Sequence, residues 1–118
     1  MFQIIGPITV PAAGTPVRVT NSIATDAHGL NPDPARFSCH AALFQARPSN
    51  TGKVYIGLAT MSKSTLAGVA AVLAVPTANV IPSFSMALTL SPAGIDLSDL
   101  YLDADTNGEG ILLSVLIT

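Results

Sequence analysis

The amino-acid sequence predicts an all-β protein: an antiparallel β-sandwich, jelly-roll-like, with about eight short strands. One observation is that apolar residues recur at every second position, as in a half-buried strand whose successive side chains face opposite sides. Another is that clusters of Gly, Pro, Asn and Ser interrupt these runs at short intervals, which is typical of a sandwich or barrel. The length of 118 residues fits one domain, so we expect residues 1–118 to form a single β-sandwich.

The alternation places the strands in order along the chain. Val17 and Val19 flank Arg18 in an early strand, and the clearest run, residues 83–90, turns Phe84 to one side and serines to the other. The C-terminal run, residues 111–117, is nearly apolar on both faces, which predicts a central strand or one covered by a partner. The expected strands lie near residues 2–10, 16–23, 36–46, 53–60, 70–75, 79–90, 99–104 and 110–118.

Two runs define one apolar face each, formed by Phe37, Cys39, Ala41 and Leu43 in one strand and by Val54, Ile56 and Leu58 in the other.

Two segments fit the strand pattern less well. Residues 24–35 contain Pro32 and Pro34 and are expected to form a long surface loop. The Ala-rich residues 64–75, from Ser64 to Val75, fit either a strand or one or two helical turns, against which Gly68 and the valines count.

The charge content is low for a globular domain. Asp, Glu, Lys and Arg make up 10% of the residues, against about 25% in ordinary soluble domains, and apolar residues make up 49%. A surface of small neutral residues loses little solvation when another protein covers it, so this composition favours burial in an assembly over an isolated monomer. The few basic residues form no patch, which argues against a nucleic-acid partner. The most apolar run, residues 65–75, is shorter than the roughly 20 residues that cross a bilayer, so we expect no membrane partner.

We find no pattern that predicts catalysis. Cys39 and His40 are neighbours, and neighbours in a strand face opposite sides, so they cannot form a catalytic dyad there. Cys39 is interpreted as a small core residue and His28 as a solvated loop residue. Neither histidine has a second ligand at zinc-site spacing. We therefore expect no enzymatic activity, no cofactor and no catalytic residue.

One loop resembles a cation site. Asp103, Asp105 and Asn107 have the spacing with which an EF-hand loop begins, and Gly108 follows them. Ser114 stands where that loop needs a bidentate glutamate, and no helical pattern flanks it. The preferred interpretation is a β-hairpin with a type I′ Asn-Gly turn between two apolar strands, and a bound cation is the alternative.

Three motifs resemble segments of small structural proteins of tailed bacteriophages. Residues 50–57 (NTGKVYIG) resemble their N-T-G-x-V-Y-I-G segment, residues 95–104 (IDLSDLYLDA) are similar to a DLSDLYVDA segment, and residues 106–111 (TNGEGI) match an NGEGV ending before a final strand. The resemblance covers residues 37–118 well and residues 1–36 loosely, and the chain departs from it at the Ala-rich residues 64–75. It implies a small sandwich or jelly-roll virion component, often one that decorates or cements the capsid, with no catalytic residue.

The function expected from this resemblance is a non-enzymatic virion structural protein. We expect a capsid decoration or cement protein that binds the major capsid protein or other virion proteins, is a homo-oligomer and is made in the host cytoplasm. The contacts are expected from residues 2–10, 24–35 and 64–75. A head–tail or tail component, a receptor- or carbohydrate-binding module and a calcium-dependent adhesin using Asp103 and Asp105 remain alternatives.

Overall fold

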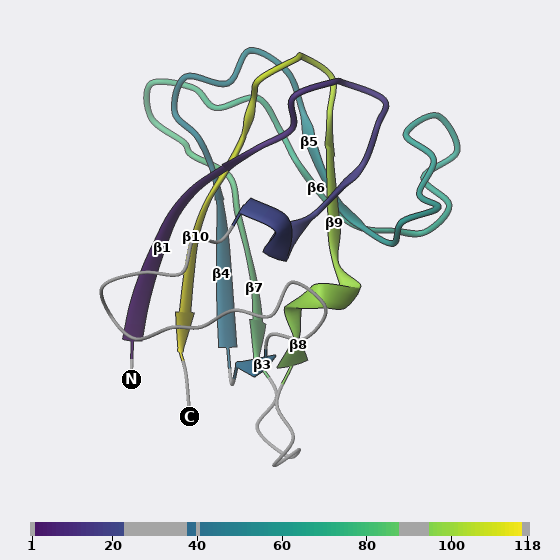
Figure 1. Cartoon of the computed structure of the whole chain (residues 1–118). Helices are drawn as coiled ribbons and strands as arrows, with labels where there is room; N and C mark the ends of the chain where they lie inside the picture. Colours follow the sequence, from purple (N-terminus) through teal and green to yellow (C-terminus); the bar gives the residue numbers. More distant parts are fainter. Residues whose placement is uncertain (1, 23–37, 40, 88–94, 117–118) are drawn as a thin grey trace.

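The structure is a computed structural model that describes residues 2–22, 38–39, 41–87 and 95–116. These residues form two four-stranded antiparallel sheets packed face to face, so the predicted all-β, sandwich-like class is confirmed (Figure 1). The first sheet has the order β1 (Phe2–Thr9), β10 (Gly110–Leu116), β4 (Ala41–Ala46) and β7 (Ser83–Ala87). The second sheet has the order β2 (Val17–Arg18), β9 (Tyr101–Ala104), β5 (Val54–Gly57) and β6 (Val69–Leu73). A short pair joins β3 (Ser38–Cys39) to β8 (Ile95–Asp96), and the 3-10 helices η1 (Val19–Ser22) and η2 (Leu97–Asp99) follow β2 and β8.

The two halves of the chain pair with each other as one long antiparallel ribbon. In nested order, β1 pairs with β10, β2 with β9, β3 with β8, β4 with β7, and β5 with β6. The ribbon doubles back at residues 58–68, the loop between β5 and β6. It is folded so that the pairs β1·β10 and β4·β7 lie in the first sheet and β2·β9 and β5·β6 in the second, and the pairings β10·β4 and β5·β9 complete the two sheets.

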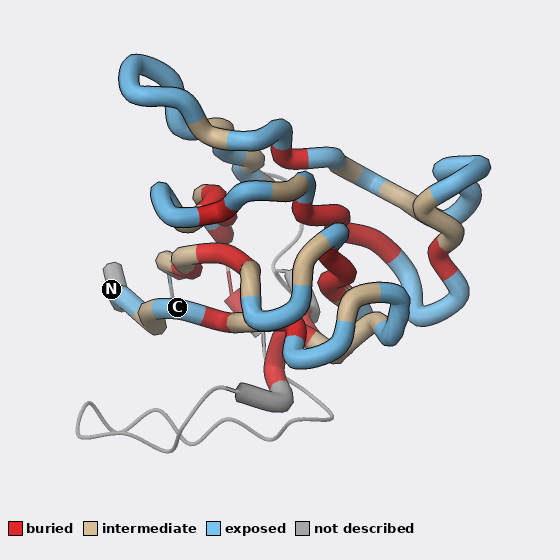
Figure 2. Tube along the Cα trace, turned by 90° about the horizontal axis from the view of Figure 1, so that it is seen from above, coloured by how far each residue is buried: buried red, intermediate tan, exposed pale blue. Residues whose placement is uncertain are grey.

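The core lies between the two sheets, where buried residues concentrate (Figure 2). Phe44 from β4 is the largest fully buried side chain, and its ring lies 6.0 Å from that of Phe84 on β7. Ile56 and Leu102 from the second sheet belong to the same buried cluster. Burial of apolar side chains at roughly 25 cal/mol per Å² is the main force that holds the sheets together.

The C-terminal strand confirms the prediction of a central strand. β10 lies between β1 and β4, and Ile111, Leu113 and Val115 are buried while Leu112 and Ser114 remain partly exposed. Both edges of β10 are paired, which is why a strand with so little polar character is stable here. Cys39 is fully buried, so its interpretation as a core residue is confirmed as well.

The face predicted for residues 36–46 is wrong beyond Cys39. Leu43, expected on the apolar face with Cys39, is 40% exposed, whereas Phe44 is 0% exposed. The reason is that this run is two strands, because Cys39 pairs with β8 and Ala41 begins a strand that pairs with β10 and β7. The inward positions therefore shift by one residue between the two strands, and the pattern in the sequence does not reveal the shift.

Several predicted boundaries are also wrong. The strand expected over residues 53–60 ends at Gly57, and Leu58 is 53% exposed rather than part of the inner face. Residues 64–75 contain strand β6 at Val69–Leu73, preceded by turns, with Leu66 in a left-handed conformation at φ 61°. Residues 19–22 are 3-10 helix rather than strand. Residues 24–35, His28, Phe37, His40, Leu88 and Leu90 lie outside the described residues.

Candidate interaction surface

Two of the motifs singled out in the sequence meet in a loop cluster, formed by residues 47–53 and 105–110. The side chain of Asn50 is only 5% exposed, and its Nδ2 donates to the carbonyl oxygen of Gly110 at 2.8 Å. Gly110 N donates to Asn50 Oδ1 at 3.4 Å, so one amide group satisfies both backbone groups of Gly110. The strands that follow and precede these loops, β5 and β9, also pair. The motifs thus form one structural unit of the fold.

Glu109 closes the same cluster from the other side. Its Oε2 accepts hydrogen bonds from Thr51 N at 2.7 Å and Thr51 Oγ1 at 2.9 Å, and its Oε1 accepts one from Gly52 N at 2.9 Å. Partial desolvation raises the pKa of Glu109, but these hydrogen bonds and the positive charge of Arg47 outweigh it, so that the pKa lies below its ordinary value. Gly52 also lets the two loops pack closely, because a Cβ there would lie 2.9 Å from Thr106 Oγ1 and 3.0 Å from Asp105 Cβ.

Of the residues expected as alternative cation ligands, Asp103 and Asn107 face the same loop between β1 and β2, and Asp105 faces the second sheet. Asp103 Oδ1 accepts hydrogen bonds from Gly14 N and Ala104 N, both at 2.8 Å. Asn107 Oδ1 accepts one from Ala13 N at 2.8 Å. Asp105 turns instead to side chains beside the second sheet. Within the described ranges no group of three or more His, Cys, Asp or Glu side chains could hold a metal ion.

The expected Asn-Gly hairpin is wrong. β9 belongs to the second sheet and β10 to the first, so residues 105–109 carry the chain from one sheet to the other. Gly108 has φ +81°, but Asn107 is not among the residues with positive φ, and a type I′ turn needs positive φ at both positions. Two backbone hydrogen bonds hold this connection in place. Gly108 N donates to Val10 O, and Val10 N donates to Glu109 O.

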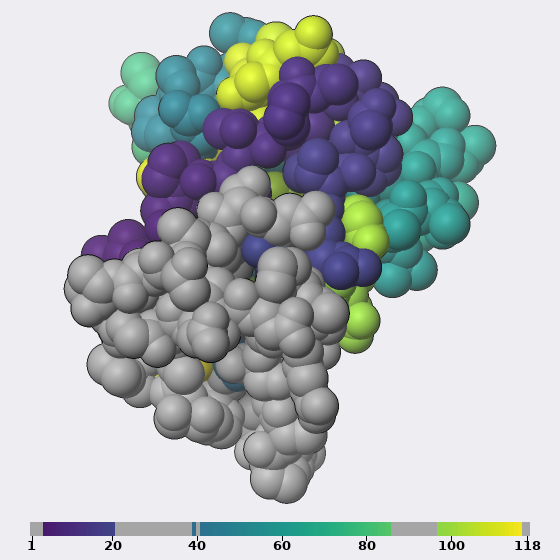
Figure 3. Space-filling model, viewed as in Figure 1, coloured from purple at the N-terminus to yellow at the C-terminus, as the bar shows by residue number. Residues whose placement is uncertain are grey.

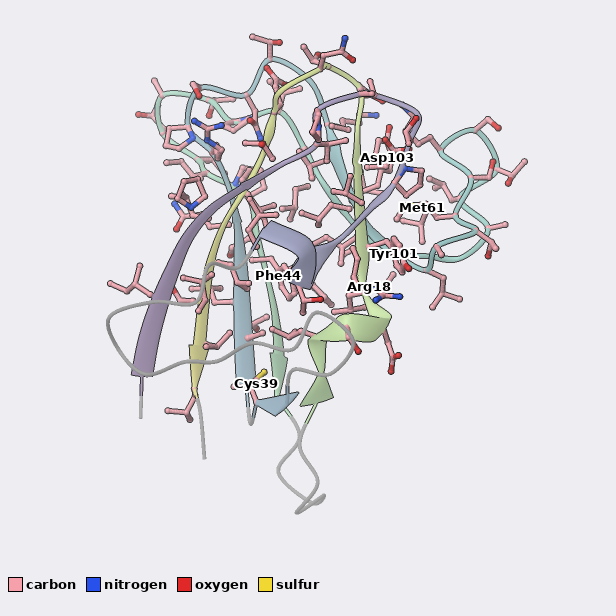
Figure 4. All side chains as sticks on the ribbon, viewed as in Figure 1. Arg18, Cys39, Phe44, Met61, Tyr101 and Asp103 are labelled. Atoms are coloured by element: carbon pink, nitrogen blue, oxygen red, sulfur yellow. The ribbon has the colours of Figure 1, made fainter. Side chains whose placement is uncertain are left out.

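The outer face of the second sheet is polar and charged. Lys63 Nζ donates to Ala104 O at 2.8 Å and lies 3.6 Å from Asp105 Oδ1, and Tyr55 OH donates to Asp105 Oδ2 at 3.3 Å. Burial raises the pKa of Tyr55, and the carboxylate of Asp105 raises it further. Figure 4 shows Arg18 and Tyr101 together on this side, where Arg18 Nε donates to Tyr101 OH at 3.3 Å.

The outer face of the first sheet is different, and we call it the uncharged face. Alternation in β4 and β10, fixed by the buried Phe44 and Leu113, turns every second residue of this sheet outward. None of its described outward side chains is charged. They are Ile4, Pro7, Thr9, Ala41, Leu43, Gln45, Ser83, Ser85, Leu112, Ser114 and Leu116.

The uncharged face is exposed and partly apolar. Ile4 is 71% exposed, Leu116 43% and Leu43 40%. The register aligns Ile4, Ser114, Leu43 and Ser85 in one row across all four strands. The charged residues of the described ranges lie elsewhere: Arg18, Lys63, Asp103 and Asp105 at the second sheet, Arg47, Lys53 and Glu109 in the loop cluster, Asp96 in β8 and Asp99 in η2. The exposed surfaces of soluble proteins usually carry charges of both signs, so this asymmetry distinguishes the first sheet from the second.

A second exposed apolar feature is the loop of residues 58–68, which we call the ribbon tip. It projects beyond the second sheet as the teal segment on the right of Figure 3. Leu66 is 51% exposed in a left-handed conformation, which costs an L-residue about 1–2 kcal/mol. Glycine or asparagine would adopt this conformation at lower cost, and Leu66 recovers little through burial. The fold itself thus gives no reason for a leucine at this position.

Sequence reasoning missed the uncharged face because its residues come from four strands that are far apart along the chain. The only signal was the low charge content. Within the described part of the chain, neither short 3-10 helix approaches the length and apolar character needed to span a membrane. Comparison of the chain with known protein families, with curated proteins and with solved structures finds no match.

Proposed function

We propose that the chain is a non-enzymatic structural protein of a virus particle, a capsid decoration or cement protein that binds neighbouring capsid subunits. The observation that carries this proposal is the uncharged face, an exposed sheet surface of four strands without a charged side chain among its described residues. When another protein covers such a face, apolar area is removed from water and no charged group has to be desolvated. The motifs that resemble tailed-bacteriophage structural proteins point to the same class of protein.

The strand pairing supports the jelly-roll part of the proposal. Nested pairs running from β1·β10 to β5·β6 make a ribbon, and four of these pairs lie two in each four-stranded sheet, β1·β10 with β4·β7 and β2·β9 with β5·β6. We interpret a ribbon rolled up in this way as a jelly roll, an architecture common in capsid and lectin domains. A fold alone does not assign a function, so the proposal depends on the uncharged face rather than on the fold.

The size of the uncharged face favours a protein that acts in many copies. Four strands about 4.8 Å apart, with three rows of outward residues about 6.8 Å apart, give a footprint of about 400 Å². A stable pairwise interface buries about 800 Å² on each partner. The face alone therefore supports weak contacts, and weak contacts become effective when many copies bind a symmetric lattice.

The proposal is tested by quantitative peptide mass spectrometry on purified particles of the virus that encodes the chain. We expect a copy number comparable to that of the major shell protein. A handful of copies per particle would instead favour a head–tail or tail component. Absence of the chain from the particles would contradict the proposal and favour a receptor- or carbohydrate-binding module, which a glycan array would then examine.

A matched pair of variants ties the result to the surface. Leu43 and Val72 are both 40% exposed and lie on the outer faces of the first and second sheets. Leu43→Glu is expected to reduce incorporation into particles strongly, because it places a charge in the centre of the uncharged face. Val72→Glu is expected to leave incorporation unchanged. Equal incorporation of both variants would contradict the role of the uncharged face.

A further inference from the structure

We propose that Asn107 is a site of spontaneous covalent modification, deamidation through a succinimide formed with Gly108, and that contact with residues 10–14 restrains this reaction. The inference goes beyond the proposed function and does not depend on it. It is carried by the Asn-Gly sequence, by the exposure of both residues and by the hydrogen bonds that join each of them to the segment following β1.

Asn107 is the only asparagine of the chain that a glycine follows. The other asparagines are Asn21, Asn31, Asn50 and Asn79, which precede Ser22, Pro32, Thr51 and Val80. The nucleophile in deamidation is the backbone nitrogen of the next residue, and a side chain on that residue hinders its approach to the amide carbon. Gly108 has no side chain, and nothing lies within 4 Å of the position that a Cβ would occupy. Asn107 and Gly108 are both exposed, so water reaches the succinimide and ammonia can leave.

The reaction requires only this chain and water. Gly108 N loses its proton to solvent and attacks Asn107 Cγ, so that an N–Cγ bond forms. The Cγ–Nδ2 bond then breaks, and the amide nitrogen takes up a proton and leaves as ammonia. Water hydrolyses the succinimide at one of its two carbonyl groups. Hydrolysis at Cγ gives aspartate, and hydrolysis at the main-chain carbonyl gives isoaspartate, whose main chain runs through Cγ.

Two hydrogen bonds hold the reacting groups to the segment that follows β1. Gly108 N donates to Val10 O at 2.8 Å, and Ala13 N donates to Asn107 Oδ1 at 2.8 Å. In Figure 1 this segment and the connection between β9 and β10 lie side by side at the top of the molecule. One short segment therefore controls both the nucleophile and the amide that it attacks.

Each of these hydrogen bonds opposes a step of the reaction. Loss of the Gly108 proton in this arrangement would turn a negative nitrogen toward the carbonyl oxygen of Val10, which is electrostatically unfavourable. The bond from Ala13 N opposes the rotation of the Asn107 side chain that brings Cγ to Gly108 N. Deamidation is therefore fastest when residues 10–14 open away from the turn, a local opening that leaves the rest of the fold intact.

Modification would weaken the junction between β1 and β10. Isoaspartate lengthens the main chain by a methylene group directly before Gly108, whose nitrogen bonds Val10 O, and Val10 N donates in turn to Glu109 O at 2.8 Å. These bonds join the end of β1, an edge strand of the first sheet, to the beginning of β10. A converted copy would hold β1 less firmly, and the change is irreversible because the ammonia is lost.

The experiment follows deamidation of the purified full chain at mildly alkaline pH by peptide mapping with mass spectrometry, which separates asparagine from both products. Ala13→Pro removes the N–H group that bonds Asn107. It is compatible with the turn of residues 12–15, because Thr15 N donates to Ala12 O at 3.1 Å and Gly14 has φ +89°. A type II turn has this form and favours proline directly before such a glycine. Ala13→Ser is the matched control, because serine keeps the N–H group.

We expect the folded wild-type chain to convert Asn107 slowly, to a mixture of aspartate and isoaspartate. Asn79, which is exposed and precedes Val80, is the internal reference and should stay unmodified in the same samples. Unfolding in urea should accelerate conversion of Asn107 at least about tenfold, because both hydrogen bonds are then lost. Ala13→Pro should accelerate it about two- to fivefold in the folded chain, the effect of losing a single hydrogen bond, and Ala13→Ser should match the wild type.

Three results would overturn the inference: a folded chain in which Asn107 stays intact, equal rates in the folded and urea-unfolded chains, or an Ala13→Pro variant that reacts no faster than Ala13→Ser. Melting curves establish that each variant is folded. If Ala13→Pro is unfolded, wild-type rates at urea concentrations below the unfolding transition replace it. They must rise with urea as residues 10–14 open, and a constant rate would contradict the restraint. The proposed function is tested on particles and fails separately.

Discussion

Replacement of Asn50 by alanine tests the loop cluster that joins the two sequence motifs. Asn50 is 5% exposed, and its amide both donates to Gly110 O at 2.8 Å and accepts from Gly110 N at 3.4 Å. Alanine removes both bonds and leaves a cavity beside a backbone segment that connects the two sheets. In this variant the carbonyl oxygen of Gly110 still accepts a hydrogen bond from Arg47 N at 3.3 Å. The backbone N–H of Gly110 is therefore the group that the substitution affects most.

The expected loss of stability follows from these contacts. The well-formed bond at 2.8 Å contributes about 1 kcal/mol, and a buried N–H left without its partner costs about 1–3 kcal/mol. The long bond at 3.4 Å reduces the second contribution, since the group is only weakly satisfied at the start. We expect a total of about 2–3 kcal/mol, which lowers the melting temperature of a domain of this size by about 10 °C.

The assay is thermal and urea unfolding followed by circular dichroism, with Asn107→Ala as the control. Asn107 also accepts a backbone hydrogen bond, from Ala13 N at 2.8 Å, but this bond is exposed and water can replace it. Asn50→Asp should be at least as damaging as Asn50→Ala, because it removes the donor and sets a second oxygen against Gly110 O. If Asn50→Ala destabilised the chain no more than Asn107→Ala, the hydrogen bonds between Asn50 and Gly110 would have no special role in stability.

Three further predictions concern single side chains. Glu109→Gln lowers stability at pH 7, and because the folded-state pKa of Glu109 is depressed, the difference from wild type fades as the pH falls below 4.5 in melting curves. In the variant Tyr101→Phe, Tyr55 is the only tyrosine, and titration of its absorbance should give a midpoint above 10.0. Because the pKa of Tyr55 is raised in the folded state, its contribution to stability is lost as the pH rises through that pKa. A midpoint at 10.0 would refute the argument from burial. Cys39 is 0% exposed, so a thiol reagent should label it only as the protein opens, at a rate that rises with urea; immediate labelling of the native protein would contradict its placement.

The sequence by itself determined what depends on neighbours along the chain. The alternation in residues 83–87 and 111–116 predicted strands there, and apolar residues on both sides of the latter predicted the central position of β10. The burial of Cys39 followed from the same reasoning. Turn residues at 48–52 marked the loop between β4 and β5. These inferences succeed because a strand buries alternate residues whichever strands it pairs with.

Only the tertiary structure decided which strands pair and where each outward residue lies. The shift of the inward face between Cys39 and Phe44 arises because β3 and β4 have different partners, and the Asn107-Gly108 segment crosses between sheets because β9 and β10 pair elsewhere. Asp103 and Asn107 accept hydrogen bonds from adjacent residues of the loop between β1 and β2, whereas Asp105, which lies between them in the sequence, bonds Tyr55 on β5. The uncharged face depends on the register of four strands drawn from both ends and the middle of the chain. Register is a property of pairs of strands distant in sequence, and for that reason the pattern along a single strand could not predict it.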